Sequence, residues 1–231
     1  MYEEMHRKHG GAYTIGGAEF CSYAEYSCPF CGASDRDRLI AVYVENLIRT
    51  SSVRQSWNVV EFAPSGPMRR LVERLSAEHK GFLRWRTADM MMKGVDDPGV
   101  DICNMKIYQD GQFDLFICSH VLEHVADDRA AMRELWKILK PGGRGVLLVP
   151  IQLSVQKTDE DPNVTDIGER WRRFGQDDHV RMYAKQDFLQ RLTDAGFTVE
   201  QLGVKDFGRL FSWRLRLAPN SNLYVVHKSG L

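Results

Sequence analysis

The amino-acid sequence predicts an α/β fold, in which helices flank a seven-stranded, mostly parallel sheet that follows a small N-terminal extension. Three observations support this prediction. Short apolar runs alternate with stretches of helical periodicity after residue 56, which is typical of βαβ units. The sequence Pro-Gly-Gly at 141–143 follows a basic turn and is expected to end a helix. With 231 residues, the chain is long enough for one large domain with an appendage.

The first 50 residues form the expected extension. Residues 1–35 are rich in Gly, aromatic and polar residues and show no sustained period. Residues 36–50 place their apolar side chains on one face of a helix. We therefore expect residues 1–50 to lead into a main domain at 51–231.

Seven short apolar runs predict the strands of the main domain: residues 57–62, 82–87, 100–103, 113–119, 144–151, 197–201 and 223–227. Helices are expected at 68–78, 127–139 and 185–195. Residues 152–183 are mostly polar and weakly periodic, so we expect an insertion or lid there, because long loops in compact domains often cover binding sites.

Composition and charge exclude several classes of protein. The sequence is 43% hydrophobic and 27% charged, which argues against a disordered or fibrous chain. Its 31 basic and 31 acidic residues leave no net charge that would attract nucleic acid or anionic lipid. No apolar run reaches the roughly 18 residues of a membrane helix, and no signal peptide is recognisable. We expect a cytoplasmic protein without a membrane or nucleic-acid partner; the sequence predicts no oligomeric state.

Acidic and small residues follow the first two predicted strands, where open parallel sheets bind ligands. Glu61 ends the first strand and can hold a polar or cationic group. Small residues, which let the backbone approach a ligand, follow it: Ala63, Pro64, Ser65 and Gly66. Asp89 ends the second strand, where a carboxylate either accepts hydrogen bonds from a ribose diol or caps the next segment.

The spacing of His120, Glu123 and His124 matches H-x-x-E-H, in which two histidines on one helical face bind zinc in peptidases. That motif requires a long helix. Here it directly follows the strand expected at 113–119, and residues 121–125 are too few for such a helix. The sequence therefore does not favour a zinc peptidase, and no metal is predicted at this site.

The same region resembles class I S-adenosylmethionine-dependent methyltransferases. That family carries F-D-x-x-x-x-x-x-V-L-E-H-V, an acidic pair, a helix, and L-K-P-G-G before a strand. These elements occur here in order at 113–125, 127–128 and 139–143. A narrower bacterial subgroup is also similar, through F-A-P at 62–64, C-P-F-C-G and R-D-R at 28–38, and F-G-Q-D-D-H-V-R-M-Y at 174–183. The resemblance covers residues 57–227 and implies a Rossmann-like sheet that ends with an antiparallel strand.

The resemblance also implies S-adenosylmethionine as cofactor and gives several residues a role. Glu61 would face the cationic methionine part, residues 63–66 would pass close to it, and Asp89 would hold the ribose. Ser119 and His120 would line the pocket. The family usually has an acidic residue after the third strand for the adenine amine, and here Asn104 is a neutral candidate for that hydrogen bond.

Methyl transfer to oxygen or nitrogen of a small molecule or sugar is the expected reaction, and a hydroxyl acceptor also requires a base. His179 suits this task because histidine titrates near neutrality, although it also suits a hydrogen bond within its own loop. Arg181 and Tyr183 alternate with it and are expected to contact the acceptor. His124 either contacts substrate or packs where the strand gives way to the helix.

The five cysteines are an odd number for a chain without an export signal, so disulfides are not expected. Cys28 and Cys31 have the spacing of half a zinc knuckle, for which Cys21 and a distant His6 or His9 would have to supply the other ligands. A reduced thiol pair is the alternative. Cys103 and Cys118 lie in predicted strands and are expected in the core.

Other functions remain open at this point. A non-catalytic relative that keeps the fold and binds a partner is favoured by the first turn, which lacks two glycines. A dinucleotide oxidoreductase is disfavoured because no G-x-G-x-x-G follows the first strand. A nucleic-acid module built on the Cys28 pair, Arg36 and Arg38 is disfavoured by the zero net charge.

Overall fold

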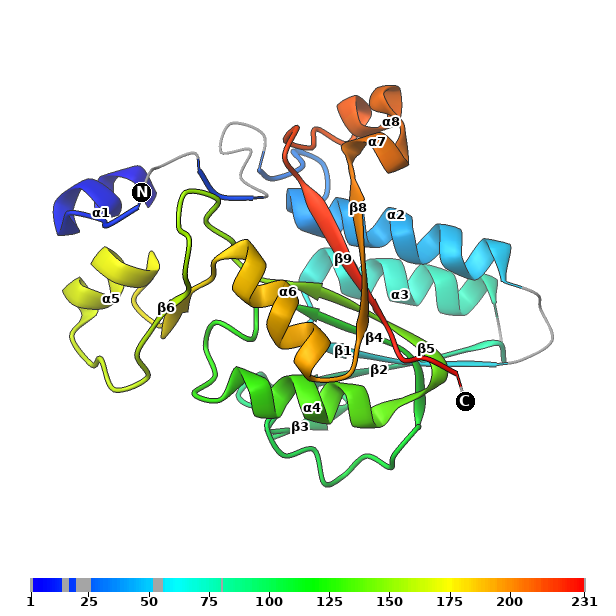
Figure 1. The fold of residues 1–231 in the computed structure, drawn as a ribbon. Helices are drawn as coiled ribbons and strands as arrows, with labels where there is room; N and C mark the ends of the chain where they lie inside the picture. Colours follow the sequence, from blue (N-terminus) through cyan, green and yellow to red (C-terminus); the bar gives the residue numbers. More distant parts are fainter. Residues whose placement is uncertain (1, 14–16, 20–25, 52–55, 80, 231) are drawn as a thin grey trace.

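The computed structural model describes residues 2–13, 17–19, 26–51, 56–79 and 81–230. Its main sheet has seven strands in the order β3-β2-β1-β4-β5-β9-β8 (Figure 1). The strands are β1 (Trp57–Phe62), β2 (Leu83–Asp89), β3 (Asp97–Pro98), β4 (Phe113–Ser119), β5 (Leu139–Leu148), β8 (Thr198–Gly203) and β9 (Asn222–His227). β9 runs antiparallel between β5 and β8, and the pairs from β3 to β5 are parallel. The predicted Rossmann-like α/β architecture is confirmed.

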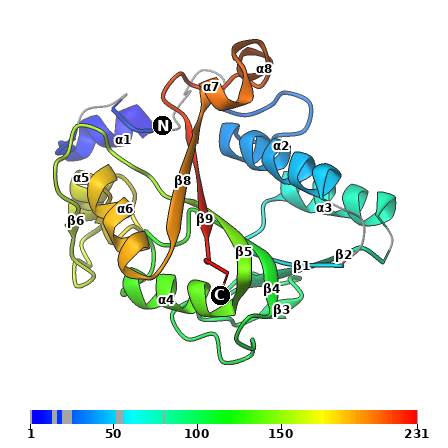
Figure 2. The same cartoon turned by 45° about the vertical axis from the view of Figure 1, so that its right-hand side comes forward.

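Helices cover both faces of the sheet. α2 (Asp35–Thr50) and α3 (Gly66–Glu78) lie on one face, and α4 (Asp128–Ile138) and α6 (Lys185–Asp194) lie on the other (Figure 2). The central strands are accordingly apolar on both sides, and Val59 of β1 and Leu115 of β4 are paired and fully buried. Two short helices, α7 (Val204–Phe207) and α8 (Arg209–Arg214), connect β8 to β9.

Local capping residues fix where the helices begin. Ser34 accepts a hydrogen bond from the Asp37 backbone amide, and the Asp37 side chain accepts one from the Ser34 amide, so a capping box starts α2. Asp127 caps α4 in the same way through the amide of Ala130. The acidic residue that ends the strand-to-helix connection after β4 is therefore structural.

The third strand lies earlier in the chain than predicted. β3 is Asp97–Pro98, and residues 100–103 are a turn. Gly99 has φ +76° and bends the chain, while the amides of Gly99 and Val100 both donate to the Asp89 carbonyl, so the segment leaves the sheet. Val100 and Ile102 are buried, which explains why the pattern resembled a strand. Cys103 consequently lies half-buried in a turn, whereas Cys118 is buried in β4 as expected.

The stretch 152–183 has more regular structure than its sequence indicated. It contains α5 (Ile167–Phe174) and a two-stranded antiparallel sheet of β6 (Asp159–Glu160) and β7 (Arg181–Met182). α1 (Tyr2–His9) lies beside α5 in both views (Figures 1 and 2). Each helix is too short to be stable alone, so contact between them accounts for both.

The N-terminal extension also contacts the main sheet. Glu19 is buried and accepts hydrogen bonds from Lys185 Nζ at 2.7 Å, from Asn222 Nδ2 at 2.9 Å and from the Tyr224 hydroxyl. Cys28 and Cys31 are free thiols, and Cys21 lies outside the described residues. None of the described helices combines the length and apolar character needed to cross a lipid bilayer.

Candidate functional site

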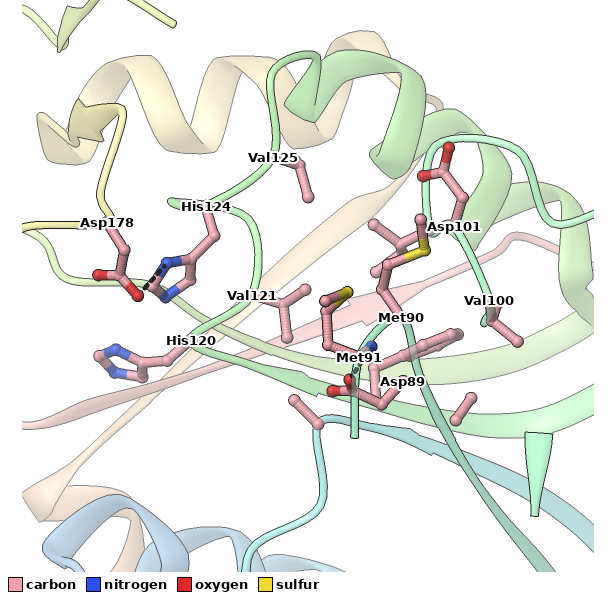
Figure 3. A pocket seen from close by; sticks show the side chains of 14 residues that line it. Asp89, Met90, Met91, Val100, Asp101, His120, Val121, His124, Val125 and Asp178 are labelled. Atoms are coloured by element: carbon pink, nitrogen blue, oxygen red, sulfur yellow. Dashed lines mark hydrogen bonds and ion pairs between the residues drawn. The ribbon is translucent and has the colours of Figure 1, made fainter. Parts of the chain in front are cut away.

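A pocket of about 570 Å³ lies beyond the carboxyl ends of β1, β2 and β4. The chain reverses its direction of winding between β1 and β4, and doubly wound sheets bind ligands where that happens. Four short segments, one after each of these strands and one after β3, form most of its lining: Phe62, Ala63, Ala88, Asp89, Met90, Met91, Val100, Asp101, Ile102, His120, Val121, His124, Val125 and Asp178. Figure 3 shows how the polar members of this set surround the opening.

Four of the residues predicted for the site line this pocket: Ala63, Asp89, His120 and His124. The Asp89 carboxylate accepts hydrogen bonds through Oδ1 from the amides of Met91 and Met92, at 2.7 and 2.6 Å. The capping role that the sequence left open for this residue is therefore present. Asp89 also lines the pocket, so this capping role and contact with a ligand are compatible.

Backbone conformation is unusual at two of these positions. Ala63 has φ +51° and His120 has φ +56°, the left-handed region that favours glycine. The Ala63 amide donates to the Ala88 carbonyl, and the His120 amide donates to the Leu148 carbonyl. Strained residues of this kind cluster at functional sites. The first turn thus keeps a glycine-like conformation at a position occupied by alanine.

Other predicted cofactor residues lie next to the pocket without lining it. Ser65 caps α3 through the amide of Met68 and donates its hydroxyl to Asp37, and Pro64 and Gly66 flank it at the start of that helix. Ser119 ends β4 with its hydroxyl buried and without a hydrogen-bond partner among the residues described. Asn104 lies in the turn after β3, outside the lining.

The pocket contains a second acidic residue that the sequence did not indicate. Asp101 lines the pocket, and its carboxylate accepts a hydrogen bond from the Cys103 amide at 2.9 Å. Because residues 100–103 were expected to form a strand, the first position after that strand was taken to be Asn104. With β3 at Asp97–Pro98, the residue that reaches the pocket is Asp101. A Gly immediately before an apolar run was the available signal for a turn.

Glu61 is buried beneath the first turn and is only 3% exposed. Its carboxyl accepts a hydrogen bond from Trp85 Nε1 at 3.2 Å. Burial raises the pKa of Glu61 to about 8, and the hydrogen bond from Trp85 only partly opposes this shift. The side chain is therefore protonated at neutral pH in the folded protein.

A cluster of histidines and one carboxylate borders the pocket. His120 Nδ1 lies 2.9 Å from Oε1 of the fully buried Glu123. His124 Nδ1 lies 3.3 Å from Asp178 Oδ2 (Figure 3). His179 is 3% exposed and packs edge-on against the His124 ring at 4.8 Å. Burial lowers the pKa of His179 in spite of the neighbouring Glu123. Of the two predicted bases, His124 lines the pocket and His179 lies behind it.

Arg181 and Tyr183, expected to contact the acceptor, are buried away from the pocket lining. The Arg181 guanidinium donates to the carbonyls of Leu122, Val125 and Ala126 at 2.5, 2.6 and 2.9 Å. The Tyr183 hydroxyl donates to Asp128 Oδ2 at 2.6 Å. Both side chains thus hold the turn after β4 and the start of α4 in place.

Comparison with known proteins agrees with this geometry. The model of a family described as a methyltransferase domain matches residues 22–202, more than half of the chain. The chain belongs to this methyltransferase family. Its enzyme class is therefore methyl transfer. No curated protein sequence matches.

Solved structures share the fold at low sequence identity. An S-adenosylmethionine-dependent methyltransferase from Mesorhizobium loti is 17% identical with a TM-score of 0.51, over 80% of this chain and 96% of that one. A complex between the Haloferax volcanii Trm112 methyltransferase activator and a methyltransferase matches at 15% identity and a TM-score of 0.51, covering 85% and 94%. The [4+2]-cyclase SpnF matches at 12% identity and a TM-score of 0.53, covering 99% and 94%. These likenesses concern the fold.

Proposed function

We propose that this methyltransferase binds S-adenosylmethionine in the pocket beyond β1, β2 and β4, and transfers its methyl group to oxygen or nitrogen of a small-molecule or saccharide acceptor. The observation that carries this proposal is that two carboxylates, Asp89 and Asp101, line the same pocket together with apolar side chains. A ribose offers two hydroxyl donors and adenine offers an amine donor, so two separated acceptors suit the nucleoside.

The apolar part of the lining supports the same assignment. Met90, Met91, Val100 and Ile102 line the pocket together with the two carboxylates. An adenine ring is flat and largely apolar on its faces, so such side chains can sandwich it while its edge is hydrogen-bonded. Met91 is 85% exposed, which is unusual for a large apolar side chain and fits a surface that a ligand covers.

The acceptor would bind on the other side of the pocket, against His120, His124 and Asp178. Asp178 belongs to the stretch 152–183, which we propose covers the acceptor as an insertion on a domain that spans residues 51–231. Transfer of a methyl group from a sulfonium depends mainly on positioning and exclusion of water, and a hydroxyl acceptor must also lose a proton. The histidine-carboxylate wall is the part of the pocket that can promote that loss.

Calorimetric titration of the purified protein with S-adenosylhomocysteine, with NAD as a control ligand, tests the cofactor proposal. We expect micromolar binding of S-adenosylhomocysteine alone. Asp89→Ala and Asp101→Ala each remove a charged hydrogen-bond acceptor and should weaken binding by about 10- to 100-fold. The matched control is Asp110→Ala, since Asp110 is an exposed carboxylate paired loosely with Lys137.

Two results would contradict the proposal. A folded protein that does not bind S-adenosylhomocysteine would instead support a non-catalytic member of the family. Equal affinities in Asp89→Ala, Asp101→Ala and Asp110→Ala would place the cofactor elsewhere.

A second assay distinguishes oxygen from nitrogen as the methylated atom. It measures the release of S-adenosylhomocysteine from S-adenosylmethionine in the presence of panels of hydroxyl and amine acceptors.

A further inference from the structure

Three side chains from distant parts of the chain converge beside the pocket. Glu123 and His124 belong to the turn after β4, and His179 lies two residues before β7. The Val180 amide donates to the Glu123 carbonyl at 2.9 Å, which joins the two segments. One ligand atom from each of the three side chains lies within 4.8 Å of the others. We call Glu123, His124 and His179 the His-Glu triplet.

The carboxylate of the triplet lacks the partners that burial demands. Glu123 is 0% exposed, and neither of its oxygens accepts a well-formed hydrogen bond from the described part of the chain. Its closest neighbour is His120 Nδ1, 2.9 Å from Oε1. His120 is the near partner of Oε1, and no described group donates a hydrogen bond to Oε2, so a cation beside Glu123 would add a partner for this fully buried carboxylate.

Both histidines of the triplet direct an unprotonated nitrogen toward this carboxylate. His179 Nδ1 lies 3.1 Å from the Phe174 carbonyl oxygen, which can only accept, so Nδ1 carries the proton and Nε2 has the lone pair. His124 Nδ1 faces Asp178 Oδ2 at 3.3 Å in the same manner. Each Nε2 lies 4.0 Å from Glu123 Oε1. Ring nitrogens fixed in this way by a carbonyl or a carboxylate are typical of metal-binding histidines.

We propose that Glu123, His124 and His179 bind one divalent transition-metal ion. Two imidazole nitrogens and one carboxylate suit Zn²⁺ or Fe²⁺, which share this donor set. Around a tetrahedral ion with bonds of about 2.1 Å, ligand atoms lie about 3.4 Å apart. The two histidine–carboxylate distances are 4.0 Å and the whole set lies within 4.8 Å, so the ligand atoms would have to move closer together by roughly 1 Å when an ion binds. Hard Mg²⁺ prefers oxygen ligands and is not expected to bind tightly.

The open side of this metal site faces the pocket. Glu123 and His179 are buried, whereas His124 lines the pocket and has a side chain 34% exposed. Coordination positions not taken by protein are therefore reached from the acceptor side. If the proposed methyl transfer holds, an acceptor hydroxyl bound there would lose its proton more readily, because a bound cation lowers the pKa of a coordinated oxygen.

Metal binding is tested by equilibrium titration of protein stripped with EDTA. The probes are Zn²⁺, anaerobic Fe²⁺ and Mg²⁺, and bound metal is counted by elemental analysis. The protein carries Cys21→Ser, Cys28→Ser and Cys31→Ser, so that the three N-terminal thiols cannot form an alternative site. We expect one Zn²⁺ or Fe²⁺ per chain at micromolar affinity or better, and at least 100-fold weaker Mg²⁺ binding.

Ligand variants locate the ion. His124→Asn and His179→Asn should each weaken Zn²⁺ binding by about 100-fold. Loss of a residue that only orients a metal ligand typically weakens metal binding by about 10- to 100-fold, and loss of the ligand itself should cost at least as much. His227→Asn is the matched control, because His227 lies on β9 outside the pocket lining, with its Nε2 3.1 Å from Glu200 Oε2. The Zn²⁺ affinity of this variant should stay within twofold of that of the unaltered protein. The half-exposed His124 keeps the test informative if His179→Asn does not fold.

Three outcomes decide between the proposals. Folded protein that binds S-adenosylhomocysteine but no transition metal overturns the metal site and leaves the methyltransferase proposal intact. Zn²⁺ affinity that is equal in His124→Asn, His179→Asn and His227→Asn also overturns it. Metal binding that depends on both triplet histidines, in protein that does not bind S-adenosylhomocysteine, supports the metal site and contradicts the cofactor proposal.

Discussion

Glu61→Gln tests whether the buried carboxyl under the first turn is neutral. In the folded protein the pKa of Glu61 is about 8, whereas an exposed glutamate has a pKa near 4.5. Between these two values the native state holds a proton that the unfolded chain has released. Since stability falls with pH wherever the native state binds more protons, Glu61 should destabilise the protein progressively from pH 4.5 to about 8.

The magnitude follows from the size of the shift. Each pH unit in this window changes the free energy of unfolding by about 1.4 kcal/mol, so the full difference is bounded by about 5 kcal/mol. Glutamine is neutral at every pH and keeps an oxygen that accepts the hydrogen bond from Trp85. We therefore expect Glu61→Gln to match the unaltered protein near pH 5 and to exceed its stability by several kcal/mol at pH 8.5.

Urea denaturation monitored by circular dichroism at intervals between pH 5 and 9 measures this difference. Other titrating groups are common to both proteins and cancel when the two curves are subtracted. Glu78→Gln is the control, because Glu78 is exposed and paired with Arg74 on α3, and its curve should differ little with pH. A difference that is constant over this range, or one that favours glutamate as pH rises, would refute the reasoning.

Three further substitutions test how Arg181 and two glycines contribute to stability. Arg181→Lys cannot reproduce three hydrogen bonds to the 122–126 turn, so we expect a loss of about 3–5 kcal/mol in the free energy of unfolding; a change below about 0.5 kcal/mol would contradict this role. Gly196→Ala should cost about 1–3 kcal/mol, because Gly196 has φ +101° and a Cβ there would lie 2.9 Å from Trp136 Nε1. Gly66→Ala at the start of α3, where an added Cβ would meet only Arg70 Nη1 at 3.8 Å, should be neutral or stabilising in the same denaturation assay.

The sheet could be predicted from the sequence because its inner strands are continuously apolar. The expected bounds of β1 and β4 agree with the structure to the residue, since turn residues limit both runs. The third strand could not be placed in this way. It has only two residues, Asp97 and Pro98, which are too few to show the hydrophobic pattern of a strand. The apolar residues that follow Gly99 are buried in the core, although they lie in a turn.

The polar residues of the site show a different limit. An extended stretch such as 179–183 does not reveal which side chains point to a ligand and which are buried in the protein. Arg181 and Tyr183 are buried because their partners, among them Asp128 and Glu160, come from other elements. The grouping of His179 with Glu123 depends in the same way on tertiary contact, and no local spacing indicates it.

Ala63 and His120 line the pocket with positive φ angles, and this explains how the first turn can function without two of the expected glycines. A non-glycine residue in this conformation costs about 1–2 kcal/mol, which a random turn would avoid. Here backbone hydrogen bonds tie Ala63 to Ala88 and His120 to Leu148, so the neighbouring strands hold both residues in place. The small side chain at position 63 still permits close approach of a ligand. The strain is therefore located where the two central strands β1 and β4 diverge, and it shapes the same pocket that the carboxylates and histidines line.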